Sequence, residues 1–222
     1  MIHKTRKRPL DIPIIQALQR RLPDSFKGDP FLEDLLKQFQ AGYAGEKELD
    51  YALEGIRFDF PGCRTLQDLS LATGENHVQL DTVVVTAKGV FLFEVKHLTG
   101  LVKLDTVNRQ MIQCRHGETR TMKDPFGQMA AARRKFRNLF TARRMPAPPV
   151  YSLLVFTNDH MELDASAATG FVQKWDVLDA MLALTANESD PLEPPDIKRI
   201  SDLLPDHHRP QHPRYQNGVY KQ

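Results

Sequence analysis

The sequence predicts an α/β fold in which a central mixed β-sheet is flanked by helices. Two valine-rich runs with strong β-propensity, residues 78–85 and 90–95, lie close together in the chain. A third apolar run, residues 150–157, follows several prolines and has the composition of a fully buried strand. Apolar residues that recur at helical spacing before and after these runs predict the covering helices.

The length and charge of the chain limit its class. A chain of 222 residues suits one domain with additions, and its net charge of +2 means that nucleic-acid binding would require local basic patches. The two cysteines, Cys63 and Cys114, form no Cys-x-x-Cys pair, so neither a zinc ribbon nor a disulfide framework is expected. No apolar stretch has the length of a membrane span, so we expect a cytoplasmic protein without a membrane partner.

Residues 1–39 are expected to form a helical N-terminal extension. Apolar residues between positions 14 and 22 recur at helical spacing, and Pro23 ends the pattern. The basic segment Lys4–Arg8 is interpreted as a solvated end beside this helix, with phosphate contact as the less favoured alternative.

A second helical stretch begins at Pro30 and continues past residue 50. Gly42 and Gly45 indicate either a break in this helix or a close approach to another element. Glu48 and Asp50 are expected to face solvent, which is the usual environment of carboxylates on a helix.

The two valine-rich runs are expected to pair as an antiparallel hairpin. If the connecting loop has two or four residues, Val85 faces Val90 and Asp81 stands directly opposite Glu94. A three-residue loop would place the two carboxylates on opposite faces unless a bulge restored the register. Lys96 shares a face with Glu94 because side chains alternate along a strand with period two.

Directly opposed carboxylates repel each other, and burying one alone is costly. A divalent cation would remove this repulsion, and sites rich in oxygen ligands suit magnesium or manganese. The hairpin therefore predicts a Mg²⁺ or Mn²⁺ site at Asp81 and Glu94.

The order of several motifs resembles a known family. Asp81, twelve further residues and then Glu94-x-Lys96 is similar to the pattern of the PD-(D/E)xK nucleases, with Leu80 in place of the usual proline. Additional blocks appear in the same order as in the nuclease-related domain, called NERD, and this resemblance covers residues 40–160. The blocks are Ala44-Gly45-Glu46, Gln79-Leu80-Asp81-Thr82, Gly89 to Lys96, Gly100, and Asp124-Pro125-Phe126-Gly127-Gln128.

The resemblance implies a restriction-endonuclease-like core with helical N- and C-terminal extensions. It also implies hydrolysis of phosphodiester bonds in DNA, in which Lys96 orients the attacking water or stabilises the developing negative charge. Glu46 would project from the first helix towards the hairpin, and Gln128 would lie near the scissile phosphate. The implied catalytic residues are Asp81, Glu94, Lys96, Glu46 and Gln128, and the implied metal ligands are Asp81, Glu94 and the main-chain carbonyl of Val95.

A helix is expected from about Phe126 to Arg144, because Asp124-Pro125 is a typical helix start. This helix is the most basic in the chain, and we expect it to contact a nucleic-acid backbone. The residues assigned to nucleic-acid binding are Gln79, Arg133, Arg134 and Arg137. Residues 161–204 are expected to complete the core, and residues 205–222 to form a flexible tail.

The sequence thus predicts a magnesium- or manganese-dependent deoxyribonuclease that acts in DNA processing or repair. The alternative is a nuclease-like core that binds nucleic acid or protein without cutting. The partner expected in the first case is DNA, and a homodimer is left open.

Overall fold

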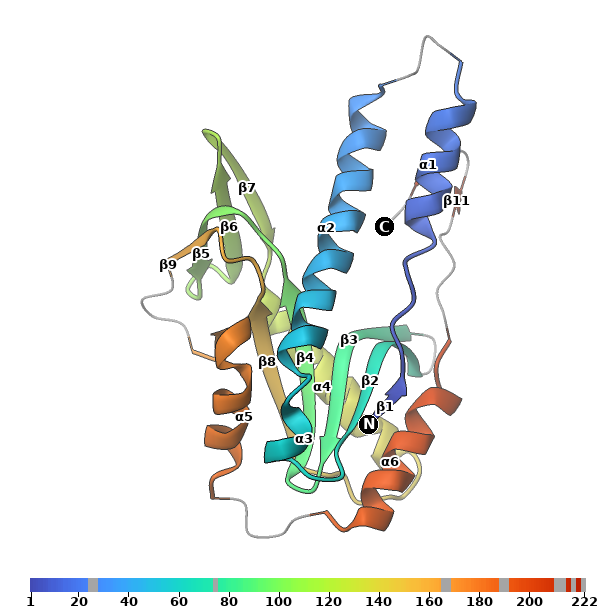
Figure 1. Cartoon of the computed structure of the whole chain (residues 1–222), viewed down its shortest axis with the longest axis vertical. Coiled ribbons are helices and arrows are strands. Elements are labelled where there is room, and N and C mark those ends of the chain that lie inside the picture. Colours follow the sequence, from blue (N-terminus) through green and yellow to red (C-terminus); the bar gives the residue numbers. More distant parts are fainter. Residues whose placement is uncertain are drawn as a thin grey trace.

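The computed structural model describes residues 1–23, 28–73, 76–164, 169–187 and 192–209, and the backbone of two short strands, β11 (Tyr215–Gln216) and β12 (Val219–Tyr220). The described chain forms a six-stranded mixed sheet, a smaller four-stranded sheet and helices that flank them (Figure 1). The predicted α/β class with a central mixed sheet is confirmed.

The larger sheet has the strand order β1-β2-β3-β4-β8-β10. Antiparallel pairing joins β2 to β3 and β3 to β4, whereas β1–β2, β4–β8 and β8–β10 are parallel pairs. The strand bounds are β1 (Ile2–Lys4), β2 (Arg64–Thr73), β3 (Asn76–Thr86), β4 (Gly89–Lys96), β8 (Val150–Phe156) and β10 (Phe171–Gln173).

The strands that follow the hairpin form a separate sheet, which the sequence did not predict. Its order is β7-β6-β5-β9, with bounds β5 (Gly100–Asp105), β6 (Gln110–Arg115), β7 (Glu118–Lys123) and β9 (Met161–Asp164). Gly100 starts β5 with a φ of +76°, and a Cβ there would lie 2.5 Å from the carbonyl oxygen of Cys114. Only glycine fits this turn without strain, so Gly100 lets the chain leave β4 and pack against β6.

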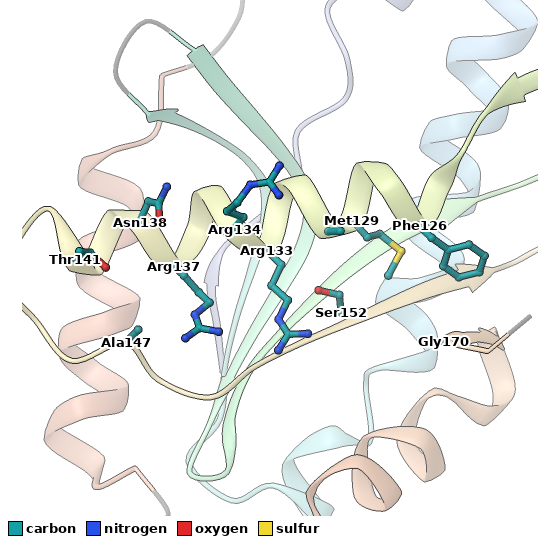
Figure 2. Close-up of a pocket in the computed structure, with 11 residues that line it drawn as sticks. Phe126, Met129, Arg133, Arg134, Arg137, Asn138, Thr141, Ala147, Ser152 and Gly170 are labelled. Atoms are coloured by element: carbon teal, nitrogen blue, oxygen red, sulfur yellow. The ribbon is translucent and has the colours of Figure 1, made fainter. Parts of the chain in front are cut away.

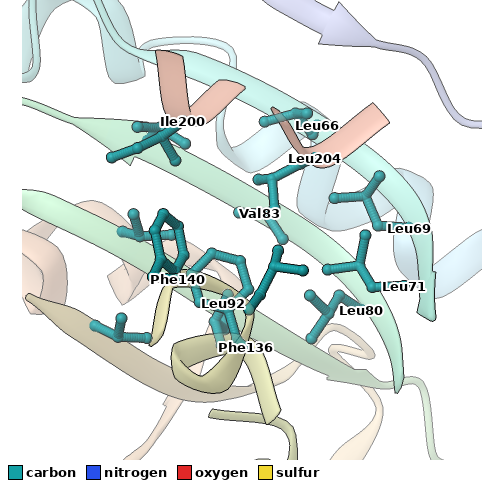
Figure 3. Close-up of a cluster of buried hydrophobic side chains, with 14 of the residues drawn as sticks. Leu66, Leu69, Leu71, Leu80, Val83, Leu92, Phe136, Phe140, Ile200 and Leu204 are labelled. Atoms are coloured by element: carbon teal, nitrogen blue, oxygen red, sulfur yellow. The ribbon is translucent and has the colours of Figure 1, made fainter. Parts of the chain in front are cut away.

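Helices cover both faces of the larger sheet. On one face, α4 and α6 pack Phe136, Phe140 and Leu204 against Val83 and Leu92 (Figure 3). On the other face, α2, α3 and α5 contribute to a second buried cluster that includes strand residues of β3, β4 and β8. The helix bounds are α1 (Asp11–Arg21), α2 (Pro30–Ala52), α3 (Ile56–Asp59), α4 (Pro125–Thr141), the 3₁₀ turn η2 (Lys174–Asp176), α5 (Val177–Thr185) and α6 (Pro194–Asp206).

Helix α2 runs without a break, and of its two glycines only Gly45 serves close packing. The Asp29 side chain caps the helix by accepting a hydrogen bond from the Phe31 N–H at 2.9 Å. A Cβ at Gly45 would overlap the side chain of His97 and lie 2.9 Å from the Thr157 hydroxyl oxygen. The missing side chain at Gly45 therefore lets α2 approach the carboxyl ends of β4 and β8, with Glu46 as the next residue.

The ends of the chain add to the core. Strand β1 precedes α1 and joins the edge of the larger sheet, so the N-terminal segment contains a strand as well as a helix. The boundary expected at residue 40 falls within α2, and the tail expected from residue 205 begins within α6 and continues largely outside the described residues. Among the described helices, none combines the length and apolar character that crossing a bilayer requires.

Candidate active site

The β3–β4 hairpin has the register that brings two carboxylates together. A two-residue loop, Ala87-Lys88, joins the strands, and Val85 pairs with Val90 as expected. The paired ladder ends at Thr82↔Phe93, one step before Asp81 and Glu94. The two carboxyl groups are nevertheless close, because the charge of Glu94 raises the pKa of Asp81. The short loop and the apolar strand residues, which are buried on both faces of the sheet, set the register of the paired part of the hairpin.

Asp81 is held where its negative charge is unfavourable. Its Oδ2 accepts a hydrogen bond from the main-chain N–H of Val95 at 2.8 Å. Burial raises the pKa of Asp81 to about 8, with further increases from the negative charges of Glu94 and Glu46, while the Val95 N–H and Lys96 oppose this rise. The carboxylate thus stores a repulsion that a cation would relieve.

Glu94 and Lys96 form an ion pair at the end of β4. The Lys96 Nζ lies 2.6 Å from the Glu94 Oε1, and each side chain is 24% exposed. Both side chains are therefore partly accessible to solvent, and the charges of both act on the carboxyl group of Asp81.

The first turn of α4 lies at the same level of the sheet. In the parallel β4–β8 pair, Glu94 is opposite Leu154 and Lys96 is opposite Phe156. Leu154 and Phe156 share a buried cluster with Met129 of α4. Gln128, the preceding residue, is exposed to solvent.

Arg6 reaches into this region from the N-terminal segment, which corrects the interpretation of Lys4–Arg8 as a solvated end. Its side chain is 4% exposed and donates to Glu46 Oε2 at 2.5 Å and to Asp50 Oδ2 at 3.0 Å. It also donates to the main-chain carbonyl of Asp81 at 3.0 Å and to the Thr82 hydroxyl at 2.8 Å. Arg6 thereby connects α2 to β3 beside the two opposed carboxylates.

The sequence contains one signal for this contact. Glu46 and Asp50 are four residues apart and therefore share a helix face, where two carboxylates repel unless a cation lies between them. Asp50, expected to face solvent, instead has a side chain that is only 20% exposed and pairs with Arg6. Arg6 is the cation that lies between these two carboxylates, because β1 pairs in parallel with β2 and thereby brings residue 6 next to α2.

Glu46 faces the sheet rather than bulk solvent. Its side chain is 26% exposed, and burial raises its pKa whereas the Arg6 guanidinium lowers it. The charge of Glu46 is close enough to Asp81 to raise the pKa of that carboxyl.

A second buried cation fixes the opposite side of α2. Lys174 has a side chain that is 5% exposed, and its Nζ lies 2.8 Å from both Glu48 Oε2 and Asp159 Oδ2. Glu48 was expected to face solvent, and its side chain is 44% exposed while it pairs with Lys174. The two ion-paired cations, Arg6 and Lys174, therefore tie the C-terminal half of α2 to the sheet and to η2.

The hairpin offers hard oxygen donors to a cation. Across the described residues, no group of three or more His, Cys, Asp or Glu side chains converges as a ready metal-binding cluster. The donor set at the hairpin is thus two carboxylates, Asp81 and Glu94, with main-chain oxygen beside them. Oxygen donors of this kind fit Mg²⁺ or Mn²⁺, which commonly retain several water ligands.

The family model described as "Nuclease-related domain" (NERD) matches residues 41–157, which is more than half of the chain. The chain belongs to the NERD family. Its usual superfamily context is PD-(D/E)xK, as the motif order indicated. Comparisons with curated proteins and with solved structures gave no match. Family membership supports a nuclease-like function and an interaction with nucleic acid.

The residues of this NERD chain assigned to nucleic-acid binding lie in two places. Gln79 on β3 is exposed, and its amide donates to the Asp68 carboxylate at 3.1 Å. Arg133, Arg134 and Arg137 are exposed on α4 and line a pocket of about 570 Å³ (Figure 2). Gln79 is not one of the residues that line this pocket, and its position on β3 does not bring it there.

Proposed function

We propose that this NERD chain is a metal-dependent nuclease that hydrolyses phosphodiester bonds in DNA, with Mg²⁺ or Mn²⁺ as its cofactor. The observation that carries the proposal is the proximity of three charged side chains at the ends of β3 and β4. The Asp81 carboxyl accepts the Val95 N–H, the Glu94 charge raises its pKa, and Lys96 is ion-paired to Glu94. Membership of a nuclease-related family supports the same function independently of this geometry.

Each residue of the hairpin has a distinct task in this proposal. Asp81, Glu94 and the main-chain carbonyl of Val95 would hold the metal ion. When bound, the ion would supply a nucleophilic water at neutral pH and neutralise charge in the transition state. Lys96, already beside Glu94, would orient the attacking water or stabilise the developing negative charge.

The surrounding elements would support this centre. Glu46, whose charge already acts on Asp81, would be an auxiliary ligand for the metal or its water. Gln128 would contact the scissile phosphate from the first turn of α4. The exposed arginines of α4 would bind the DNA backbone, since phosphate contacts position a nucleic acid without selecting its sequence.

The decisive experiment compares Mg²⁺-dependent cleavage of circular single-stranded and duplex DNA by the wild type and by Asp81→Asn. The variant is nearly isosteric, and we expect cleavage to fall by orders of magnitude because one metal ligand is weakened. Lys96→Ala should retain metal binding, measured by calorimetry, and lose turnover. Glu118→Gln changes an exposed carboxylate on β7 and should cut at the wild-type rate.

Two outcomes would reject the proposal. If Asp81→Asn cuts at the wild-type rate, any cleavage originates elsewhere in the chain. If the wild type binds DNA but cuts neither substrate with Mg²⁺ or Mn²⁺, the chain is the non-cleaving binding module that the sequence left as an alternative.

A further inference from the structure

The pocket beside α4 combines a basic side and an apolar side. Its volume is about 570 Å³, and it lies between α4 and the start of β8. In Figure 2, Arg133 and Arg137 project from α4 towards β8, whereas Arg134 points the opposite way. Arg133 and Arg137 are thus the two guanidinium groups that the pocket gathers on one side.

These two arginines carry charge without a counter-charge. They are four residues apart on one helix, so their positive charges repel each other. Within the described part of the chain, neither guanidinium has a recorded ion pair or hydrogen bond. An anion bound between them would relieve the repulsion, and the planar fork of arginine matches the oxygens of a phosphate.

Ser152 supplies a second, independent observation. Its hydroxyl oxygen is buried in the pocket wall and has no hydrogen-bond partner among the described residues. Buried polar groups are nearly always hydrogen-bonded, so the Ser152 hydroxyl lacks a partner that a bound ligand or a water would supply. A phosphate oxygen held by Arg133 and Arg137 would satisfy it.

The other side of the pocket suits an apolar, flat group. Met129 lies one helical turn before Arg133, which is about 6 Å along the axis, and Phe126 lies almost one turn further. Side chains on a helix lean towards its N-terminus, so Arg133 leans towards Met129. A ligand that contacts both the basic side and the apolar side of the pocket therefore needs a phosphate and a flat apolar ring. The distance between these two groups must not exceed the length of one nucleotide.

The pocket is next to the candidate active site. Ser152 pairs with Leu92 of β4, and Glu94 follows two residues later on that strand. Two residues of a strand span about 7 Å, so Ser152 in the pocket wall lies about one nucleotide step along the sheet from the level of Glu94, on the neighbouring strand.

We infer that this pocket binds a single nucleotide, with its phosphate between Arg133 and Arg137, where it accepts a hydrogen bond from Ser152, and its base against Met129 and Phe126. The nucleotide is the one adjacent to the cleaved bond in the substrate strand. This last assignment rests on the proposed nuclease function, whereas nucleotide binding by the pocket does not.

The binding test uses deoxyadenosine monophosphate, inorganic phosphate and deoxyadenosine, each titrated into the full chain by calorimetry with a chelator present. Deoxyadenosine monophosphate should bind more tightly than either fragment. Arg133→Gln and Arg137→Gln should each weaken its binding by about tenfold or more, because a charge-assisted contact is lost. Ser152→Ala should weaken binding by a smaller factor, and Arg120→Gln, an exposed arginine on β7, should leave it unchanged.

Three results would overturn the inference: no binding of the nucleotide to the wild type, equal affinity in Arg133→Gln, Arg137→Gln and wild type, or equal affinity for phosphate and nucleotide. A cleavage assay on a short oligonucleotide distinguishes failure of the nucleotide-binding inference from failure of the proposed nuclease function. Arg133→Gln should raise KM more than it lowers kcat, whereas Asp81→Asn should mainly lower kcat. If no variant or wild type cleaves, the nuclease proposal and the adjacent-nucleotide assignment fail together, and the titration still decides whether the pocket binds a nucleotide.

Discussion

Arginine occurs in two contrasting surroundings in this chain. Arg6 is 4% exposed and donates to two carboxylates, a main-chain carbonyl and a hydroxyl. Arg133 and Arg137 are exposed on α4, and no partner is recorded for them within the described residues. The same guanidinium group is therefore fully used by the fold in one place and left for a ligand in the other.

The difference shows how surroundings assign a role to a charged side chain. A buried charge must be paired, and removing it leaves its former partners uncompensated. An exposed charge contributes little to stability but adds to the field that attracts anions. Arg6 should therefore matter for folding and for the position of Glu46, and the α4 arginines for binding.

The largest expected effect is that of Arg6→Met. Glu46 and Asp50 would keep their charges without a buried partner, so the free energy of unfolding should fall by about 3–5 kcal/mol. Denaturant titration of the purified chain measures this change. Arg8→Met, at an exposed position, should stay within about 0.5 kcal/mol of the wild type. Equal stability of the Arg6 and Arg8 variants would remove the contrast between the two regions.

A smaller destabilisation is expected for Gly45→Ala. The added methyl group would overlap His97 and push α2 away from the sheet, which would loosen the Arg6–Glu46 pair. Overpacking of this kind costs about 1–3 kcal/mol. Gly42→Ala is the matched control, because its Cβ would meet nothing within 4 Å. Gly42→Ala should raise the free energy of unfolding by about 0.5–1 kcal/mol, because alanine has a higher helix propensity than glycine. A lower free energy of unfolding for Gly42→Ala would contradict the conclusion that only Gly45 is needed for close packing.

Asp81→Asn should raise the melting temperature of the metal-free protein by a few degrees, with a defined pH dependence. The pKa of Asp81 is raised to about 8, so the folded wild type retains a proton that the unfolded chain loses above about pH 4. Wild-type stability therefore falls as pH rises through this window, and asparagine does not ionise. The difference between variant and wild type should grow from about pH 4 to about pH 8 in the presence of a chelator. A pH-independent difference would show that Asp81 ionises normally.

The α4 arginines should give the smallest change in stability. Arg133→Gln and Arg137→Gln should each stay within about 0.5 kcal/mol of the wild type. Each should instead lower the slope of log affinity against log salt for single-stranded DNA by about 0.7, because one phosphate contact is lost. Fluorescence anisotropy over a salt series measures this slope. An unchanged slope together with a clear loss of stability would assign these arginines a structural role.

Local patterns in the sequence determine the hairpin and the main helix starts. Two β-prone apolar runs joined by a two-residue loop pair as the β3–β4 hairpin, which brings Asp81 close to Glu94. The pair Asp124-Pro125 starts α4 as expected, and the Asp124 carboxylate accepts the Phe126 N–H at 3.0 Å. These features depend on residues within about twenty positions of one another, so periodicity and capping signals are sufficient to find them.

Only the tertiary structure decides which distant residues complete the site. Arg6 and Asp81 are 75 positions apart, and their contact depends on β1 joining the sheet beside β2. Ser152 becomes part of a basic pocket because α4 crosses the start of β8, which no local pattern reports. Gly100 similarly sends three strands into a second sheet through a turn that β-propensity does not reveal. Sequence periodicity records which face of an element is buried, whereas the neighbours of that face are set by packing between elements far apart in the chain.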